Sequence, residues 1–180
     1  MLTKQYLFSA ERLGFRNWHT EDLAAFAALN ADQEVMKYFP TTRTESETSA
    51  LMERLQQHYK TWGFTYFAVE VLATEAFIGF IGLTHIAYEA PFTPTIDIGW
   101  RLKKSAWGKG YATEGAKKCL SLAFEKWKLD RVVATCTIQN TPSKKVMKKI
   151  GMTRKGVFDH PKLKEYPAYQ SCIWYEIENE

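Results

Sequence analysis

The feature that most constrains this chain is a change of hydrophobic period across two glycines. Apolar and polar side chains alternate over residues 96–102, which predicts a strand. Gly108 and Gly110 interrupt that pattern, and from Ala112 the apolar residues recur at helical spacing. A glycine turn that leads into a helix leaves backbone N–H groups unpaired at the positive end of the helix dipole. The sequence therefore predicts a strand, a turn and a helix that bind a phosphate or pyrophosphate.

Two common phosphate motifs do not fit this turn. The phosphate loop of nucleotide hydrolases ends in Gly-Lys-Ser/Thr, whereas Gly110 is followed by Tyr111. The dinucleotide-binding pattern G-x-G-x-x-G fails at its last position, where this chain has Thr113. Taken alone, the two glycines are also compatible with a purely structural turn.

Three short motifs of this chain occur together in one protein family. They are Gly-Trp-Arg-Leu at 99–102, Gly-Lys-Gly-Tyr-Ala-Thr-Glu at 108–114, and Asn-Thr-Pro-Ser at 140–143 before Lys-Ile-Gly-Met at 149–152. In this combination the chain resembles the GNAT superfamily of N-acetyltransferases, and within it the branch that contains the ribosomal-protein N-terminal acetyltransferases. The similarity runs from Arg12 to the last strand. One departure is Trp107, where the superfamily usually has Gln or Arg and the resembled branch commonly has Trp.

This resemblance implies a fold and a cofactor. The expected fold is α/β, a single domain over residues 1–180, with a mixed, mostly antiparallel twisted sheet of about seven strands. The sheet is expected to be splayed at the cofactor site and flanked by about four helices. The expected acyl donor is acetyl-CoA, with no metal, and its pyrophosphate is expected on the backbone of Gly108 to Thr113. The full predicted cofactor-binding set is Ile98, Gly99, Trp100, Trp107, Gly108, Lys109, Gly110, Tyr111, Ala112, Thr113, Asn140 and Ser143.

Acyl transfer to an amine needs a proton acceptor and stabilisation of the developing oxyanion. Asp97 is the first candidate base, where the resembled branch usually has Glu, and its shorter side chain favours a bridging water. Asp97 is also compatible with binding the substrate amine or pairing with a lysine. Glu70 is a weaker alternative base. By resemblance, a backbone N–H near Gly99 or Trp100 is expected to face the thioester oxygen.

The leaving thiolate has no obvious proton donor. The superfamily often has a Tyr four residues after Ser143, but this chain has Met147 there, so Ser143 or water is the candidate general acid. Asn140 and Ser143 are also typical helix caps. A covalent acetyl-Cys136 is a minor alternative. His160 lies in a segment that is a candidate border of the acceptor site, although an incidental role is at least as well supported.

Charge is unevenly distributed along the chain. The net charge is +4, but residues 101–164 contain 17 Lys and Arg against 4 Asp and Glu. This basic block favours the polyanionic CoA and is also compatible with a solvated face or with RNA contact. The three cysteines form no CxxC pair and indicate a reducing, cytoplasmic environment. Apolar runs too short for a membrane span and the absence of a signal layout at the N-terminus agree with that expectation.

Strand and helix patterns follow one another without a repeat or a linker. Other strands are predicted at 12–16, 65–72, 77–86, 131–138, 152–158 and 171–177, and a loop at 159–168. Helices are predicted from an N-cap at Thr20, over 34–39, from Thr44 to Gly63 with a capping box at Glu47, and after Pro142 up to Gly151.

The leading functional hypothesis is acetyl-CoA-dependent N-acetylation by direct transfer within a ternary complex. The acceptor is expected to be a primary amine, either a protein N-terminus or a small molecule. The alternative is a non-catalytic acyl-CoA-binding or RNA-associated module, which does not need a carboxylate at Asp97. No membrane partner is expected and a nucleic-acid partner is not favoured. The identity of the acceptor and the oligomeric state, monomer or homodimer, stay open.

Overall fold

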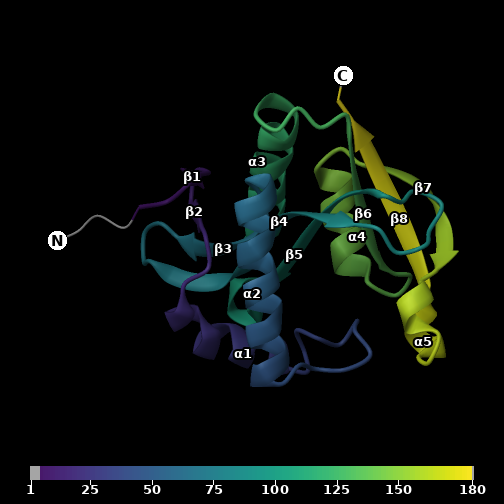
Figure 1. Ribbon diagram of the computed structural model, residues 1–180, viewed down its shortest axis with the longest axis horizontal. Coiled ribbons are helices and arrows are strands. Elements are labelled where there is room, and N and C mark those ends of the chain that lie inside the picture. The colour runs from purple at the N-terminus through teal and green to yellow at the C-terminus, as the bar shows by residue number, and fades with distance from the viewer. Residues whose placement is uncertain (1–4, 180) are drawn as a thin grey trace.

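One twisted sheet runs through the whole molecule (Figure 1). The structure is a computed structural model that describes residues 5–179. The order of the strands is β1-β2-β3-β4-β5-β6-β8-β7. The strands are β1 Phe8–Ser9, β2 Leu13–Arg16, β3 Tyr66–Val71, β4 Ala76–Ile86, β5 Thr95–Leu102, β6 Arg131–Thr137, β7 Thr153–Asp159 and β8 Ser171–Glu178. The α-helices are α1 Leu23–Ala31, α2 Glu45–Trp62, α3 Tyr111–Glu125, α4 Thr141–Lys149 and α5 Pro167–Gln170, with 3-10 turns at Thr20–Asp22, Lys104–Ala106 and Pro161–Leu163.

The predicted fold class is confirmed, with one strand and one α-helix more than expected within residues 5–179. The extra strand is β1, whose two residues are too few to show any periodicity. The extra helix is α5, a single turn that starts at Pro167 within the predicted loop 159–168. The segment 34–39 was predicted to be helical and consists of turns instead, so that prediction is wrong.

Helix boundaries follow the capping chemistry in one helix and not in another. Thr44 and Glu47 form the predicted capping box of α2, and Gly63 ends the helix with φ 74° in the left-handed region. The predicted N-cap at Thr20 is wrong, because His19 occupies that position and Thr20 is already in the 3-10 turn.

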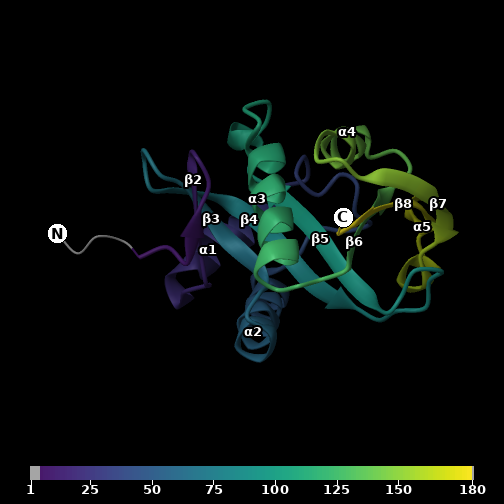
Figure 2. The same cartoon turned by 90° about the horizontal axis from the view of Figure 1, so that it is seen from above.

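Helices cover both faces of the sheet (Figures 1 and 2). On one face α1 and α2 enclose a cluster that includes Trp18, Phe26 and Phe80. On the opposite face α3 and α4 pack through Ala116 and Met147 onto the larger core, which also takes in side chains from β2 to β6 and β8. Side chains at alternate positions of each strand therefore belong to two separate environments.

The sheet is almost divided between β5 and β6. β5 pairs with β4 at all eight of its positions, and β6 pairs with β8 at all seven. Between β5 and β6, which run parallel, Asp97 and Val133 form the one ladder pair found within residues 5–179. Beyond Asp97 the inner edges of both strands are open towards their carboxyl ends, which is the predicted splay.

Candidate active site

The glycine turn after β5 takes the conformation that its sequence predicts. Gly108 and Gly110 have φ of 73° and 82°, and Gly110 is the N-cap of α3. A Cβ at Gly108 would meet nothing within 4 Å, so the backbone there faces open space. The first helical hydrogen bond runs from the Glu114 N–H to the Gly110 carbonyl. The N–H groups of residues 111–113 precede it and have no intrahelical acceptor.

Arg12, at the start of the β2 hairpin, holds this turn in place. Its Nη1 donates to the Lys109 carbonyl at 3.1 Å, and its Nε lies 2.7 Å from the Glu114 carboxylate. The guanidinium also stacks over the Tyr111 ring at 4.7 Å. The Trp107 indole N–H anchors the other end of the turn by donating to the Leu102 carbonyl at 2.8 Å. No local sequence pattern indicates the role of Arg12, because its partners lie about 100 residues away along the chain.

Asp97 lies at the vertex of the splay, facing α2 rather than α3. Its residue surface is 8% exposed, and its Oδ2 accepts a hydrogen bond from the Tyr66 hydroxyl. Burial raises the pKa of Asp97 to about 7, and the Tyr66 hydrogen bond lowers it only in part. Burial likewise raises the pKa of Tyr66, and the Asp97 charge adds to that shift. Asp97 is therefore a carboxylate that can change protonation state near neutral pH.

Tyr66 is the site residue that sequence reasoning missed. Its ring packs directly against Gly99, where an added Cβ would come within 2.8 Å of the ring. Gly99 therefore allows the Tyr66 hydroxyl to reach Asp97 across β4. Thr84, which lies between them in the sheet register, also interacts with the Tyr66 hydroxyl. Only the register of three strands brings these residues together.

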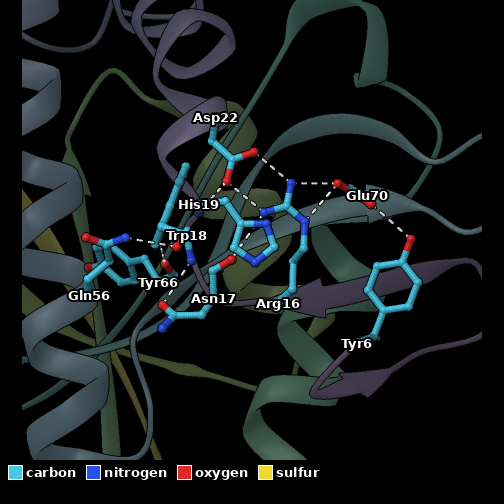
Figure 3. A network of polar contacts seen from close by, with 9 residues as sticks. All are labelled: Tyr6, Arg16, Asn17, Trp18, His19, Asp22, Gln56, Tyr66 and Glu70. Atoms are coloured by element: carbon cyan, nitrogen blue, oxygen red, sulfur yellow. Dashed lines mark hydrogen bonds and ion pairs between the residues drawn. The ribbon is translucent and has the colours of Figure 1, made fainter. Parts of the chain in front are cut away.

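Glu70, the weaker candidate base, belongs to a separate network (Figure 3). Its carboxylate accepts hydrogen bonds from Arg16 at 2.6 and 2.8 Å and from the Tyr6 hydroxyl at 2.9 Å. Glu70 lies opposite Phe77 of β4, and Asp97 lies opposite Thr84. Those two positions are about 23 Å apart along the strand, at roughly 3.3 Å per residue. Glu70 and Asp97 therefore cannot serve the same amine.

The turn between β6 and α4 is built around Asn140. The Asn140 Oδ1 caps α4 by accepting from the Ser143 N–H at 3.1 Å, so the capping alternative is confirmed for Asn140, whereas Ser143 lies inside the helix and is not its cap. Met147 is buried in the core and cannot supply a proton. Burial raises the pKa of the Cys136 thiol to about 12, and its Sγ lies 3.8 Å from the Asn140 carbonyl. A thiol with that pKa is a poor nucleophile at neutral pH.

The loop before β5 closes over the outer arm of the sheet. The Tyr88 ring lies 4.4 Å from the His160 ring, and Phe92 packs against Phe158 and Trp174. The Asp97 charge also contributes to a raised pKa of Tyr88, after burial. His160 is thus linked to the surroundings of Asp97 through Tyr88, although its Nδ1 is used to accept from the Lys162 N–H.

Among residues 5–179, no three His, Cys, Asp or Glu side chains gather where they could hold a metal ion. Nor does any described helix combine the length and the apolar character that crossing a membrane requires.

The splay, the glycine turn and the helix that follows it agree with comparisons to known proteins. The family model described as "Acetyltransferase (GNAT) domain" matches residues 12–153. The chain belongs to the GNAT acetyltransferases. It is 34% identical to YnaD of Bacillus subtilis, an uncharacterized N-acetyltransferase, over 83% of this chain and 84% of that protein.

Solved GNAT structures have the same fold. A GNAT-family acetyltransferase from Bacillus anthracis superposes with a TM-score of 0.78 at 32% identity, covering 94% of this chain and 96% of that one. The ribosomal-protein-S5-alanine acetyltransferase of Vibrio fischeri has a TM-score of 0.76 at 20% identity, covering 96% of each chain. The second likeness shows the fold alone. GNAT proteins use acetyl-CoA, which confirms the predicted acyl donor at the level of the family.

Proposed function

We propose that this GNAT protein transfers an acetyl group from acetyl-CoA directly to a primary amine, with Asp97 as the proton acceptor. One observation carries the proposal: Asp97 is buried at the vertex of the splay and its pKa is raised to about 7. A purely structural carboxylate is usually held by a cation, as Glu70 is held by Arg16. Asp97 instead has a neutral tyrosine as its hydrogen-bond partner.

The residues of the turn fit a CoA pyrophosphate. Gly108 and Gly110 present backbone at positive φ, and the first turn of α3 offers N–H groups without helical acceptors. In this proposal the backbone of Trp107 to Thr113 holds the pyrophosphate, and the open edges of Ile98 to Trp100 and of Asn140 and Ser143 hold the pantetheine arm. The basic block adds a favourable field. Acetyl-CoA supplies the acyl group as a thioester.

The chain's own residues then move the proton. Tyr66 holds one carboxylate oxygen of Asp97, which fixes the orientation of the other towards the acceptor side of the sheet. Asp97 takes the proton from the amine, either directly or through a water. A backbone N–H at Gly99 or Trp100, on the edge of β5 without a ladder partner, stabilises the developing oxyanion. The thiolate is a tolerable leaving group near neutral pH, so Ser143 or water suffices as acid.

The place of action is proposed from the same structure. We infer that residues 1–180 act as one domain, since one sheet extends from β1 to β7. A cytoplasmic location is supported by Cys119, Cys136 and Cys172, which are all free thiols.

The test is to measure the turnover of Asp97→Asn with a panel of amines, using the release of free thiol from acetyl-CoA as the assay. The amide keeps the size of the side chain but cannot take up a proton. We expect kcat to fall by about 10²–10⁴, with little change in acetyl-CoA affinity and a smaller loss at high pH. Asp130→Asn, an exposed carboxylate just before β6, is the matched control.

Two outcomes would contradict the proposal in different ways. Wild-type kinetics in Asp97→Asn would leave Asp97 as scaffolding and the proton to a water chain. Tight acetyl-CoA binding by the wild type with no transfer to any amine would favour the alternative from sequence, a non-catalytic acyl-CoA-binding module.

A further inference from the structure

Two arginines meet on the α2 side of the sheet without a carboxylate between them. Arg101 lies on β5, and Arg43 lies just before the start of α2. Asn30, at the end of α1, joins them: its Oδ1 accepts from Arg101 Nη1 at 2.6 Å, and its carbonyl accepts from the Arg43 N–H at 2.9 Å. Both side chains are partly exposed, so the pair is reachable from solvent.

Neither guanidinium is fully satisfied within residues 5–179. The Nε atoms of Arg43 and Arg101 are both buried and have no hydrogen-bond partner there. A buried donor without a partner costs free energy, as does the approach of two like charges. Burial and, to a smaller extent, the Arg43 charge lower the pKa of Arg101 to about 9. An oxyanion bound by the two guanidinium groups would offset the repulsion between their charges.

The acidic residues of this region are committed elsewhere. The Glu47 carboxylate accepts hydrogen bonds from the N–H and hydroxyl of Thr44 in the capping box. These bonds are the main cause of its lowered pKa, and the Arg43 charge contributes least. The Asp32 carboxylate accepts from the backbone N–H of Glu34. Glu34 itself lies 3.8 Å from the ammonium of Lys104.

Arg101 is held rigidly for such a role. Its guanidinium contacts two aromatic rings, at 4.4 Å from the Phe39 centroid and 5.3 Å from the Phe80 centroid. These two cation–π contacts restrict the orientations that the guanidinium can take. A planar fork held in this way suits bidentate recognition of a carboxylate.

The pair shares a face of β5 with the proposed base. Asp97 and Arg101 are four residues apart on one strand, so their side chains point to the same side, about 13 Å apart at roughly 3.3 Å per residue. Tyr66 lies between them, because its hydroxyl bonds Asp97 and its ring packs on Gly99. An acceptor that reaches both groups needs its amine and its anion on the order of 10 Å apart, the length of about three extended residues.

We propose that Arg43 and Arg101 form the anion subsite of the acceptor, and that the acceptor is a peptide-like amine with a carboxylate about three residues from its N-terminus. This inference rests on the proposed acetyl transfer at Asp97. The carboxylate is either the side chain of an acidic residue or the C-terminus of a short peptide. Both sources present the same chemistry to the two guanidinium groups.

The test uses peptide pairs that differ in one charge. Ala-Ala-Asp-amide is compared with Ala-Ala-Asn-amide for the side-chain source, and Ala-Ala-Ala with its amide for the C-terminal source. In the wild type we expect kcat/KM to favour the charged member of at least one pair by about 10- to 100-fold. The ratio should fall towards one in Arg43→Gln, and should persist in Lys37→Gln, an exposed cation of the same segment.

The outcomes separate this inference from the proposed function. Equal kcat/KM within both pairs, or a ratio unchanged in Arg43→Gln, would overturn the subsite while leaving acetyl transfer intact. If no peptide or simple amine is acetylated, calorimetric titration of Ala-Ala-Asp-amide into the protein with CoA decides the subsite by itself. Saturable binding that Arg43→Gln weakens at least 10-fold would support it, and binding equal to that of the Asn peptide would overturn it.

Discussion

Arg16 and Arg101 occupy the same row of the sheet in opposite electrostatic situations. Arg16 of β2 lies opposite Ala68, which lies opposite Phe80, which lies opposite Arg101 of β5. Both arginines therefore project from one face, beneath α1 and α2. Arg16 is 4% exposed and is bound by two carboxylates, Asp22 at 2.7 Å and Glu70 at 2.6 Å (Figure 3). Arg101 has an amide, two aromatic rings and a second arginine as neighbours.

The pKa values of Arg16 and Arg101 are shifted in opposite directions, which reflects this difference in their neighbours. Burial alone would lower the pKa of Arg16, but its hydrogen bonds with Asp22 and Glu70 outweigh burial and raise that pKa. At Arg101 nothing outweighs burial, and the pKa falls to about 9. A buried charge with its counter-charges in place belongs to the architecture. A partly buried charge that lacks counter-charges is typical of a binding site, where a ligand completes the pairing.

The largest predicted effect is therefore on the Arg16 side. Arg16→Met should lower the free energy of unfolding by about 3–5 kcal/mol, because it leaves the Asp22 and Glu70 carboxylates buried without their cation. Urea denaturation measures this loss, and an unchanged slope would show that the denatured state is the same. The folded fraction of Arg16→Met should show the same preference for charged acceptor peptides as the wild type. A loss below about 1 kcal/mol would break the distinction between the two arginines.

The matched change at Arg101 should cost far less. Arg101→Met removes a buried charge that lacks a carboxylate, which is a gain, and leaves the Asn30 Oδ1 without its donor, which is a loss of about 1–3 kcal/mol. These contributions oppose each other, so we expect a net change within about 1 kcal/mol of zero. The same variant should lose the preference for charged peptides. A destabilisation as large as that of Arg16→Met would mean that Arg101 is structural too.

From sequence alone, the two arginines could not be told apart. Each lies in a strand directly after an aromatic residue, and the carboxylates of Arg16 come from residues 6 and 54 positions away. The glycine turn and the position of Asp97 were predictable because motif and spacing are local. The Tyr66–Asp97 contact, the Arg12 clamp and the Arg43–Arg101 pair depend on strand register and on the path of the loop after α1, which no local pattern encodes.

The sheet also contains a carboxylate whose burial should show in the pH dependence of stability. Asp97 has a raised pKa, so between about pH 4 and pH 7 the unfolded chain releases this proton and the folded protein keeps it. The folded state binds more protons in that window, and stability therefore falls as pH rises through it. Asp97→Asn should remove this contribution and become more stable relative to the wild type as pH increases. If the free energy of unfolding of the two proteins changed with pH in the same way, the raised pKa of buried Asp97 would be contradicted.

His58 provides the smallest effect and the opposite sign. Its Nδ1 lies 2.7 Å from the Phe64 carbonyl, which requires a proton on Nδ1, and its Nε2 accepts from the His85 N–H at 3.1 Å. Burial lowers the pKa of His58, because it disfavours the charged form of the ring, and the Phe64 carbonyl opposes the shift only in part. The unfolded chain therefore binds the proton first, and stability falls as pH drops below about 6.5. His58→Gln should flatten this acid limb by a modest amount, since the ring is only half-buried and solvent screens its charge. Thermal denaturation of both proteins across that range measures the difference. A steeper acid limb in the variant would show that His58 is protonated in the folded protein. In that case a hydrogen-bonded histidine of this molecule would gain a charge without unfolding.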